Sequence, residues 1–185
     1  MKLMVFDVGG TEIKYSVMDE TLHRWDCGSI PTPTTTLDDF LSTLSALYQP
    51  HRDEVSGITM SLPGFIDVER GRVNGGGALT YNWQQPVGPL LAEKCGCPVY
   101  LANDGKCAAM AELWQGSLKG CQNASVFLIG TGVGGGLIVD GKILNGSHFT
   151  AGEYSFINVN THDWENLNDT MALRCSTIGL LARYR

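Results

Sequence analysis

The sequence lacks a basic cluster and a long apolar run, and these absences exclude several classes of protein. Its 185 residues carry a formal net charge of −6, and no grouping of Lys and Arg supplies the positive surface that nucleic acid or an anionic membrane requires. No stretch is long and apolar enough for a transmembrane helix or a signal-peptide core. We therefore expect a cytoplasmic protein with no nucleic-acid or membrane partner.

The cysteines lack the spacing of a disulfide framework. Six are present and they are scattered along the chain. Cys95 and Cys97 flank a single glycine, but no second ligand pair at zinc spacing accompanies them. We interpret this pair as structural thiols in a reducing compartment.

Apolar patterns up to about residue 115 predict strands alternating with helices. The expected strands cover residues 2–8, 13–18, 25–29, 55–61 and 98–101. The expected helices cover residues 37–47, 87–95 and 104–115, with a Thr36 cap on the first and with Gly96 and Gly116 ending the others. The first three strands should form an antiparallel meander, and residues 64–73 a hairpin or loop. This alternation is typical of an α/β fold.

A second strand-and-turn pattern begins near residue 124. Residues 124–129 form an apolar run that enters a glycine-rich turn, as residues 2–8 do. The Asp140-Gly141 pair predicts a hairpin, and a last helix is expected at about residues 169–183. We place the boundary between two lobes at residues 117 and 118.

The first turn, Asp7-Val-Gly-Gly-Thr11, has the composition of a phosphate-binding site. Its two glycines let backbone N–H groups approach a phosphate, and Thr11 adds a hydroxyl donor. Asp7, at the end of the strand, is a candidate to hold Mg²⁺ through its water ligands, because Mg²⁺ dehydrates reluctantly.

The second turn, Gly130-Thr-Gly-Val-Gly-Gly-Gly136, offers the same kind of donors. Each turn alone also fits a tight hairpin, and neither has the Gly-Lys-Ser/Thr ending of a P-loop or the spacing of a dinucleotide-binding fold. Their pairing favours a polyphosphate held from two sides. The candidate phosphate-binding residues are Asp7, Gly9, Gly10, Thr11, Lys14, Gly130, Thr131, Gly132 and Gly134.

Asn103 and Asp104 follow a buried strand and begin a predicted helix. Asp is common as a helix cap, and this role does not exclude a catalytic one. Phosphoryl transfer needs an aligned hydroxyl and a carboxylate that accepts its proton, so Asp104 is the candidate base. Asn103 is a candidate to orient a sugar by hydrogen bonds.

These residues resemble the ROK family of sugar kinases and repressors, within the actin, Hsp70 and hexokinase superfamily. The matching segments, in chain order, are DVGGT at Asp7, SLPGFID at Ser61, NDGKCAAMAE at Asn103, GTGVGGG at Gly130 and AGE at Ala151. The resemblance implies a two-lobed ribonuclease-H-like fold whose second lobe is incomplete in a chain of this length. It also implies ATP-dependent phosphorylation of a hexose or hexoside hydroxyl, with ATP and Mg²⁺ bound in a cleft.

The resemblance assigns roles residue by residue. Asp104 matches the catalytic base, and the implied sugar-binding residues are Asn103, Glu153, Gly76 and Gly77. The run after Glu153 lacks the Gly-His of many members, and no cysteine-rich motif follows, so no zinc is expected. Losing that His could leave room for the aglycone of a hexoside.

Two other functions stay open at the level of sequence. One is a sugar-binding module without catalysis. The other is a sugar-sensing regulator, which would need a helix-turn-helix before Asp7, where the chain has no room for one. We expect an incomplete second lobe to expose apolar surface, and we therefore expect a homo-oligomer.

Overall fold

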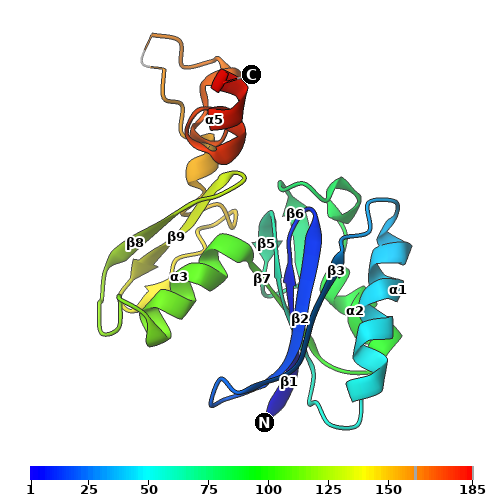
Figure 1. Ribbon diagram of the computed structural model, residues 1–185. Helices are drawn as coiled ribbons and strands as arrows, with labels where there is room; N and C mark the ends of the chain where they lie inside the picture. The colour runs from blue at the N-terminus through cyan, green and yellow to red at the C-terminus, as the bar shows by residue number, and fades with distance from the viewer. Residues whose placement is uncertain (161, 185) are drawn as a thin grey trace. The chain divides into compact units, whose positions relative to one another are not determined.

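The computed structural model describes residues 1–160 and 162–184, and the contacts divide the chain into two compact units, Met1–Asp104 and Gly105–Arg185. Figure 1 shows the elements of each unit. This contact boundary falls after the first residue of the helix at 104–115, which the sequence assigns to the first lobe. The division into functional lobes at residues 117 and 118 stays a prediction.

The first unit is built on a five-stranded sheet with the order β3-β2-β1-β4-β7. The predicted antiparallel meander is present as β1 (Lys2–Val8), β2 (Glu12–Asp19) and β3 (Arg24–Pro31). β4 (Ile58–Leu62) and β7 (Val99–Asn103) continue the sheet in parallel with β1. β4 begins later than the predicted residue 55, because the Val55 amide donates to His51 O at 3.2 Å in the preceding turn.

Helices α1 (Leu37–Tyr48) and α2 (Val87–Cys95) cover one face of this sheet (Figure 1). α1 begins at the predicted cap, where the Thr36 hydroxyl accepts from the Asp39 amide at 3.1 Å. α2 ends at Gly96, which has a left-handed φ of 70°. The unit is completed by η1 (Gln49–His51), η2 (Thr80–Asn82) and the hairpin of β5 (Phe65–Asp67) and β6 (Arg72–Gly75).

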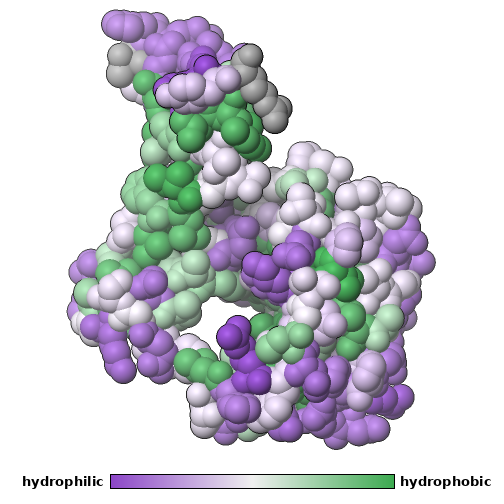
Figure 2. All heavy atoms as spheres, viewed as in Figure 1, coloured by the Kyte–Doolittle hydropathy of each residue, from purple (hydrophilic) through white to green (hydrophobic). Residues whose placement is uncertain are grey.

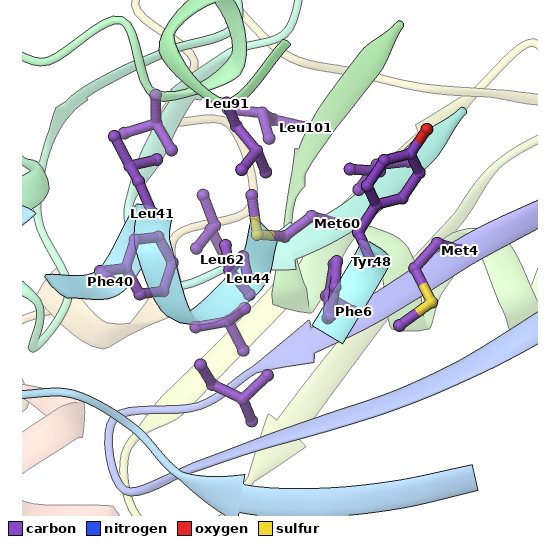
Figure 3. Close-up of a cluster of buried hydrophobic side chains, with 14 of the residues drawn as sticks. Met4, Phe6, Phe40, Leu41, Leu44, Tyr48, Met60, Leu62, Leu91 and Leu101 are labelled. Atoms are coloured by element: carbon purple, nitrogen blue, oxygen red, sulfur yellow. The ribbon is translucent and has the colours of Figure 1, made fainter. Parts of the chain in front are cut away.

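The core of the first unit lies between the sheet and these two helices. Met4 and Phe6 of β1, Met60 of β4, and Phe40 and Leu44 of α1 are each at most 1% exposed, and Figure 3 shows them packed together. Successive strand residues point to opposite faces. The positions between these core residues therefore lie on the other face of the sheet, where polar side chains are tolerated.

The second unit contains a three-stranded antiparallel sheet with the order β10-β9-β8. Its strands are β8 (Ala124–Ile129), β9 (Val133–Val139) and β10 (Lys142–Ile143), and the predicted hairpin turn at Asp140-Gly141 has φ values of 51° and 69°. Helix α3 (Asp104–Gln115), which enters this unit at Gly105, packs on the sheet through the buried Ala109.

Large apolar side chains remain exposed on the second unit. Phe127 and Ile129 of β8 are 50% and 70% exposed. Leu180, in the C-terminal region, is 56% exposed. Figure 2 shows hydrophobic surface gathered over this part of the molecule.

The prediction of one helix at residues 169–183 is wrong. The segment contains η4 (Leu167–Asp169), α4 (Met171–Cys175) and α5 (Thr177–Tyr184), after an earlier turn η3 (Tyr154–Phe156). Ser176 is extended and its hydroxyl accepts from the Gly179 amide at 3.2 Å, so it caps α5 and interrupts the helix. Within residues 1–160 and 162–184, no helix combines the length and apolarity needed to cross a membrane.

Candidate active site

Three segments singled out by the sequence meet at one edge of the first unit's sheet. β1, β4 and β7 are parallel, so their carboxyl ends lie at the same edge. In the register, Asp7 is beside Ser61, and Leu62 is beside Asn103. In open α/β sheets this edge is the usual place for a ligand.

Asp7 is exposed on the face of β1 opposite the core. The Ser61 hydroxyl donates a hydrogen bond to Asp7 Oδ1 at 2.6 Å, which fixes one carboxylate oxygen. Lys14 lies opposite Asp7 in β2, and both line a hollow of about 490 Å³ on this face of the sheet. Sequence reasoning missed Ser61 as a partner of Asp7; the available signal was its position at the end of the strand that continues into Pro63-Gly64.

The bend between β1 and β2 is held by a buried threonine that the sequence did not single out. The Gly9 amide donates to Glu12 O at 2.8 Å, which closes the bend. The Thr32 hydroxyl donates to Gly9 O at 2.8 Å, and the Thr32 amide donates to Thr11 O at 3.0 Å. Thr32 is 5% exposed, so the positions of the backbone groups in the bend are fixed by the interior of the unit.

Close backbone packing explains the glycines of the loop after β6. A Cβ on Gly77 would lie 2.8 Å from the Pro63 backbone, and a Cβ on Gly64 would lie 2.7 Å from Gly75 O. Gly76 and Gly77 also have left-handed φ values of 74° and 70°. The loop therefore packs against the end of β4, at the edge described above.

Trp83 belongs to the same loop region and is 43% exposed. The Trp83 indole N–H donates to Gly76 O at 2.7 Å. An indole with one polar anchor and an exposed ring can pack at a surface without entering the core.

Asn103 and Asp104 occupy the end of β7 and the first position of α3 as predicted. The Asn103 side chain is buried, and its amide N–H donates to Gly64 O at 3.0 Å. Asp104 is exposed. A buried, anchored amide therefore lies next to an exposed carboxylate at this edge.

The second glycine bend lies between β8 and β9 in the second unit. The Gly130 amide donates to Gly132 O at 2.9 Å, and the Thr177 amide donates to Gly130 O at 2.9 Å. A Cβ built on Gly130 or Gly132 would meet no atom within 4 Å. Packing within the chain therefore does not require glycine here, whereas close approach of a ligand to the backbone would.

The sequence predicts one turn over residues 130–136, but the glycines after Thr131 do not all belong to it. β9 begins at Val133, so Gly134 is a strand residue paired with Leu128. A Cβ on Gly134 would still meet open space, but a Cβ on Gly136 would lie 2.8 Å from Ala109 Cβ. The run thus serves two purposes: its first part leaves the backbone open, and its last part lets α3 approach the sheet.

Glu153 follows Gly152 in the second unit and is half-buried. Gly152 has a φ of 81°, and a Cβ there would lie 2.8 Å from Gly136 Cα. The Glu153 amide donates to Thr150 O at 3.1 Å. The backbone of Glu153 is therefore placed by a tight loop against β9.

The first unit also contains a group with metal-ligand chemistry, formed by Asp26, His51 and Glu54, whose ligand atoms lie within 4.8 Å of one another. His51 Nδ1 is 2.7 Å from Glu54 Oε1, and Lys2 Nζ is 3.4 Å from Glu54 Oε2. The hydrogen bond from His51 lowers the pKa of the Glu54 carboxyl. His51 and Lys2 thus both contact the Glu54 carboxylate.

Fold and bends together define the class of protein. A meander that turns at a glycine bend occurs in both units, and in the first it is followed by parallel strands. This α/β arrangement is the ribonuclease-H-like fold of the actin, Hsp70 and hexokinase superfamily. The chain aligns with the ROK hexokinase from Thermus thermophilus with a TM-score of 0.80 and 25% identity, over 100% of this chain and 63% of that one.

The family follows from the sequence match. The ROK family model matches residues 3–176, so the chain belongs to the ROK family. It is 33% identical to the N-acetyl-D-glucosamine kinase of Vibrio atlanticus (strain LGP32), over 97% of this chain and 61% of that protein. It is 32% identical to the beta-glucoside kinase of Klebsiella pneumoniae, over 85% of this chain and 52% of that protein. The chain thus spans between half and two thirds of the length of these relatives.

Proposed function

We propose that the whole protein is an ATP-dependent sugar kinase that phosphorylates a hydroxyl of a hexose or hexoside, the 6-hydroxyl in the first instance. The observation that carries this proposal is the exposed Asp104 carboxylate at the sheet edge that also holds the Gly9–Thr11 bend. A carboxylate beside backbone donors is what transfer of a phosphoryl group to an alcohol requires. Two relatives named as sugar kinases support the same activity.

Asp104 is proposed as the base that accepts the proton of the attacking hydroxyl. The residues proposed to bind the sugar are Asn103, Gly76, Gly77 and Glu153. The anchored Asn103 amide supports this, because its bond to Gly64 O holds the buried side chain in one orientation. Glu153 offers a half-buried acceptor for sugar hydroxyls.

The two glycine bends are proposed to hold the phosphates of ATP. The donors would come from Gly9, Gly10, Thr11, Lys14, Gly130, Thr131, Gly132 and Gly134. Open space at Gly130, Gly132 and Gly134 fits a phosphate lying against the backbone. Asp7, exposed and steadied by Ser61, fits a Mg²⁺ ion bound through water, and Mg²⁺ would neutralise phosphate charge.

A second candidate function is a ROK protein that binds or senses a sugar without catalysis. The observation in its favour is that the proposed sugar-binding residues Asn103 and Glu153 are present, because sugar binding needs no catalytic base. Calorimetry separates the two functions, because a protein without catalysis would bind sugar but not nucleotide.

The test uses the whole protein with ATP, Mg²⁺ and a panel of hexoses, N-acetylhexosamines and β-glucosides, with phosphorylated products identified by mass spectrometry. Asp104→Asn should lower kcat by about 10²–10⁴-fold, the usual worth of a general base, with little change in the KM for sugar. Asp53→Asn is the matched control, because the Asp53 side chain is 97% exposed and lies away from this edge in an ion pair with Arg52. Equal turnover by Asp104→Asn and the wild type would remove Asp104 as the base.

A further inference from the structure

Lys106 is a buried cation on α3. The residue is 4% exposed, and lysine is rarely buried to this extent unless its ammonium group is paired. Within the second unit, Lys106 Nζ donates to Phe149 O at 2.8 Å and to Asn145 Oδ1 at 3.3 Å. The side chain therefore ties α3 to a loop that lies beyond β8, β9 and β10 in the sequence.

Both acceptors belong to the loop Asn145–Gly152, which leads directly into Glu153. Its backbone is unusual: Gly146, Phe149 and Gly152 all have left-handed φ values, of 71°, 61° and 81°. The Ala151 amide closes the loop by donating to Asn145 O at 3.2 Å. A left-handed phenylalanine persists only where its surroundings hold it, and the bond from Lys106 ends on the carbonyl of that residue.

The charge of Lys106 also bears on Glu153. Burial lowers the pKa of the Lys106 ammonium group, and the Glu153 carboxylate opposes this shift. The two groups are thus close enough to interact electrostatically. A cation at this place attracts the Glu153 carboxylate, and a carboxylate accepts hydrogen bonds from hydroxyl groups.

We infer that Lys106 is a positioning residue, which fixes the Asn145–Gly152 loop so that Glu153 presents its carboxylate to the sugar. This inference rests on the proposed function, since it gives Glu153 a sugar as its ligand. Lys106 itself touches no reacting group in this scheme. Its contribution is to sugar binding, and the contacts that carry it are the bonds to Phe149 O and Asn145 Oδ1.

The test replaces the ammonium group by an apolar side chain of similar length. Lys106→Met in the whole protein should raise the KM for the sugar by about tenfold or more, the usual effect of losing a hydrogen bond from a charged group. The KM for ATP should stay within about twofold. Lys119→Met is the matched control, because Lys119 is an exposed lysine of the same unit, and it should change neither constant.

Hydrogen exchange supplies a readout that does not depend on activity. Amides of residues 145–153 should exchange faster in Lys106→Met than in the wild type, while those of β9 keep their rates. If Lys106→Met does not fold, Asn145→Ala removes one acceptor, and a smaller rise in the sugar KM is expected.

The outcomes separate the two proposals. Sugar kinase activity in the wild type with an unchanged sugar KM in the variant would overturn the role of Lys106 alone. Absence of any sugar kinase activity in the wild type would instead overturn the proposed function. In that case the exchange rates still decide the positioning role: unchanged rates at residues 145–153 reject it, and faster rates confined to them support it.

Discussion

The two units start in the same way and differ in the elements that come after the first hairpin. Each has a strand that enters a glycine bend and returns antiparallel, as β1-β2 and as β8-β9. In the first unit β1 gains β4 as a second neighbour, and a core closes over one face of the sheet. In the described part of the second unit β8 pairs only with β9, and Ile129 is 70% exposed. The bend is thus a local feature, whereas a closed core needs elements distant in sequence.

The largest expected effect is on stability, when a substitution in the core of the first unit is compared with one in β8 of the second. Phe40→Ala, in the core of the first unit, should lower the free energy of unfolding by about 3–5 kcal/mol, because it leaves a cavity among fully buried side chains. Ile129→Ala in β8 should change it by no more than about 0.5 kcal/mol. Urea unfolding followed by tryptophan fluorescence checks both. Similar losses for the two variants would mean that β8 is covered in solution.

The next effect separates the two purposes of the glycine run in the second unit. Gly136→Ala should cost about 1–3 kcal/mol, because its Cβ would lie 2.8 Å from Ala109 Cβ and force α3 off the sheet. Gly132→Ala has open space and should leave the unfolding free energy nearly unchanged, while weakening ATP binding measured by calorimetry. Unaltered ATP affinity in Gly132→Ala would count against a phosphate at this bend.

The exposed edge of β8 should also affect how the chain associates with itself. We expect the chain to self-associate through its apolar surface, as an unpaired strand edge favours. Ile129→Lys should weaken association by about tenfold, roughly 1.4 kcal/mol, in sedimentation equilibrium. Val68→Lys is the control, since Val68 is an exposed apolar residue in the turn between β5 and β6 of the first unit. A monodisperse wild-type monomer would reject this expectation.

The smallest effect concerns pH and the C-terminal segment. Hydrogen bonds from Asn160 and Arg174 lower the pKa of the Asp169 carboxyl below its ordinary value of 3.8. A depressed pKa means that Asp169 stabilises the fold above about pH 4 and that this stability is lost as the pH falls through the folded value. Exchange of the α4 amides should therefore accelerate on acidification in the wild type. Asp169→Asn should show less acceleration, while Asp163→Asn should behave as the wild type.

Much of the fold could be predicted from the sequence because its signals are local. The Thr36 cap, the left-handed Gly96, the Asp140-Gly141 hairpin and the bounds of α3 each depend on a few neighbouring residues, and the structure confirms them. The break at Ser176 was missed because a serine after apolar residues also fits a continuous helix. Only its hydroxyl bond to the Gly179 amide identifies it as a cap.

The residues of the candidate site could be predicted from the sequence, but the residue that holds the first bend in place could not. Strand ends and glycine bends pointed to Asp7, Asn103 and Asp104, and the parallel strands bring them to one edge. Thr32, which holds the first bend from a distant strand end, carries no local pattern that marks it. Contacts of this kind depend on tertiary packing, which single-sequence patterns do not encode.

Binding of ATP phosphate by the glycine bends is tested by asking whether both bends respond to nucleotide. Amide exchange is measured in the whole protein with Mg²⁺, with and without a non-hydrolysable ATP analogue. We expect slower exchange at Gly9, Gly10 and Thr11 and also at Thr131 and Gly132, with no change in α1. Unchanged exchange at either bend under saturating nucleotide would contradict it.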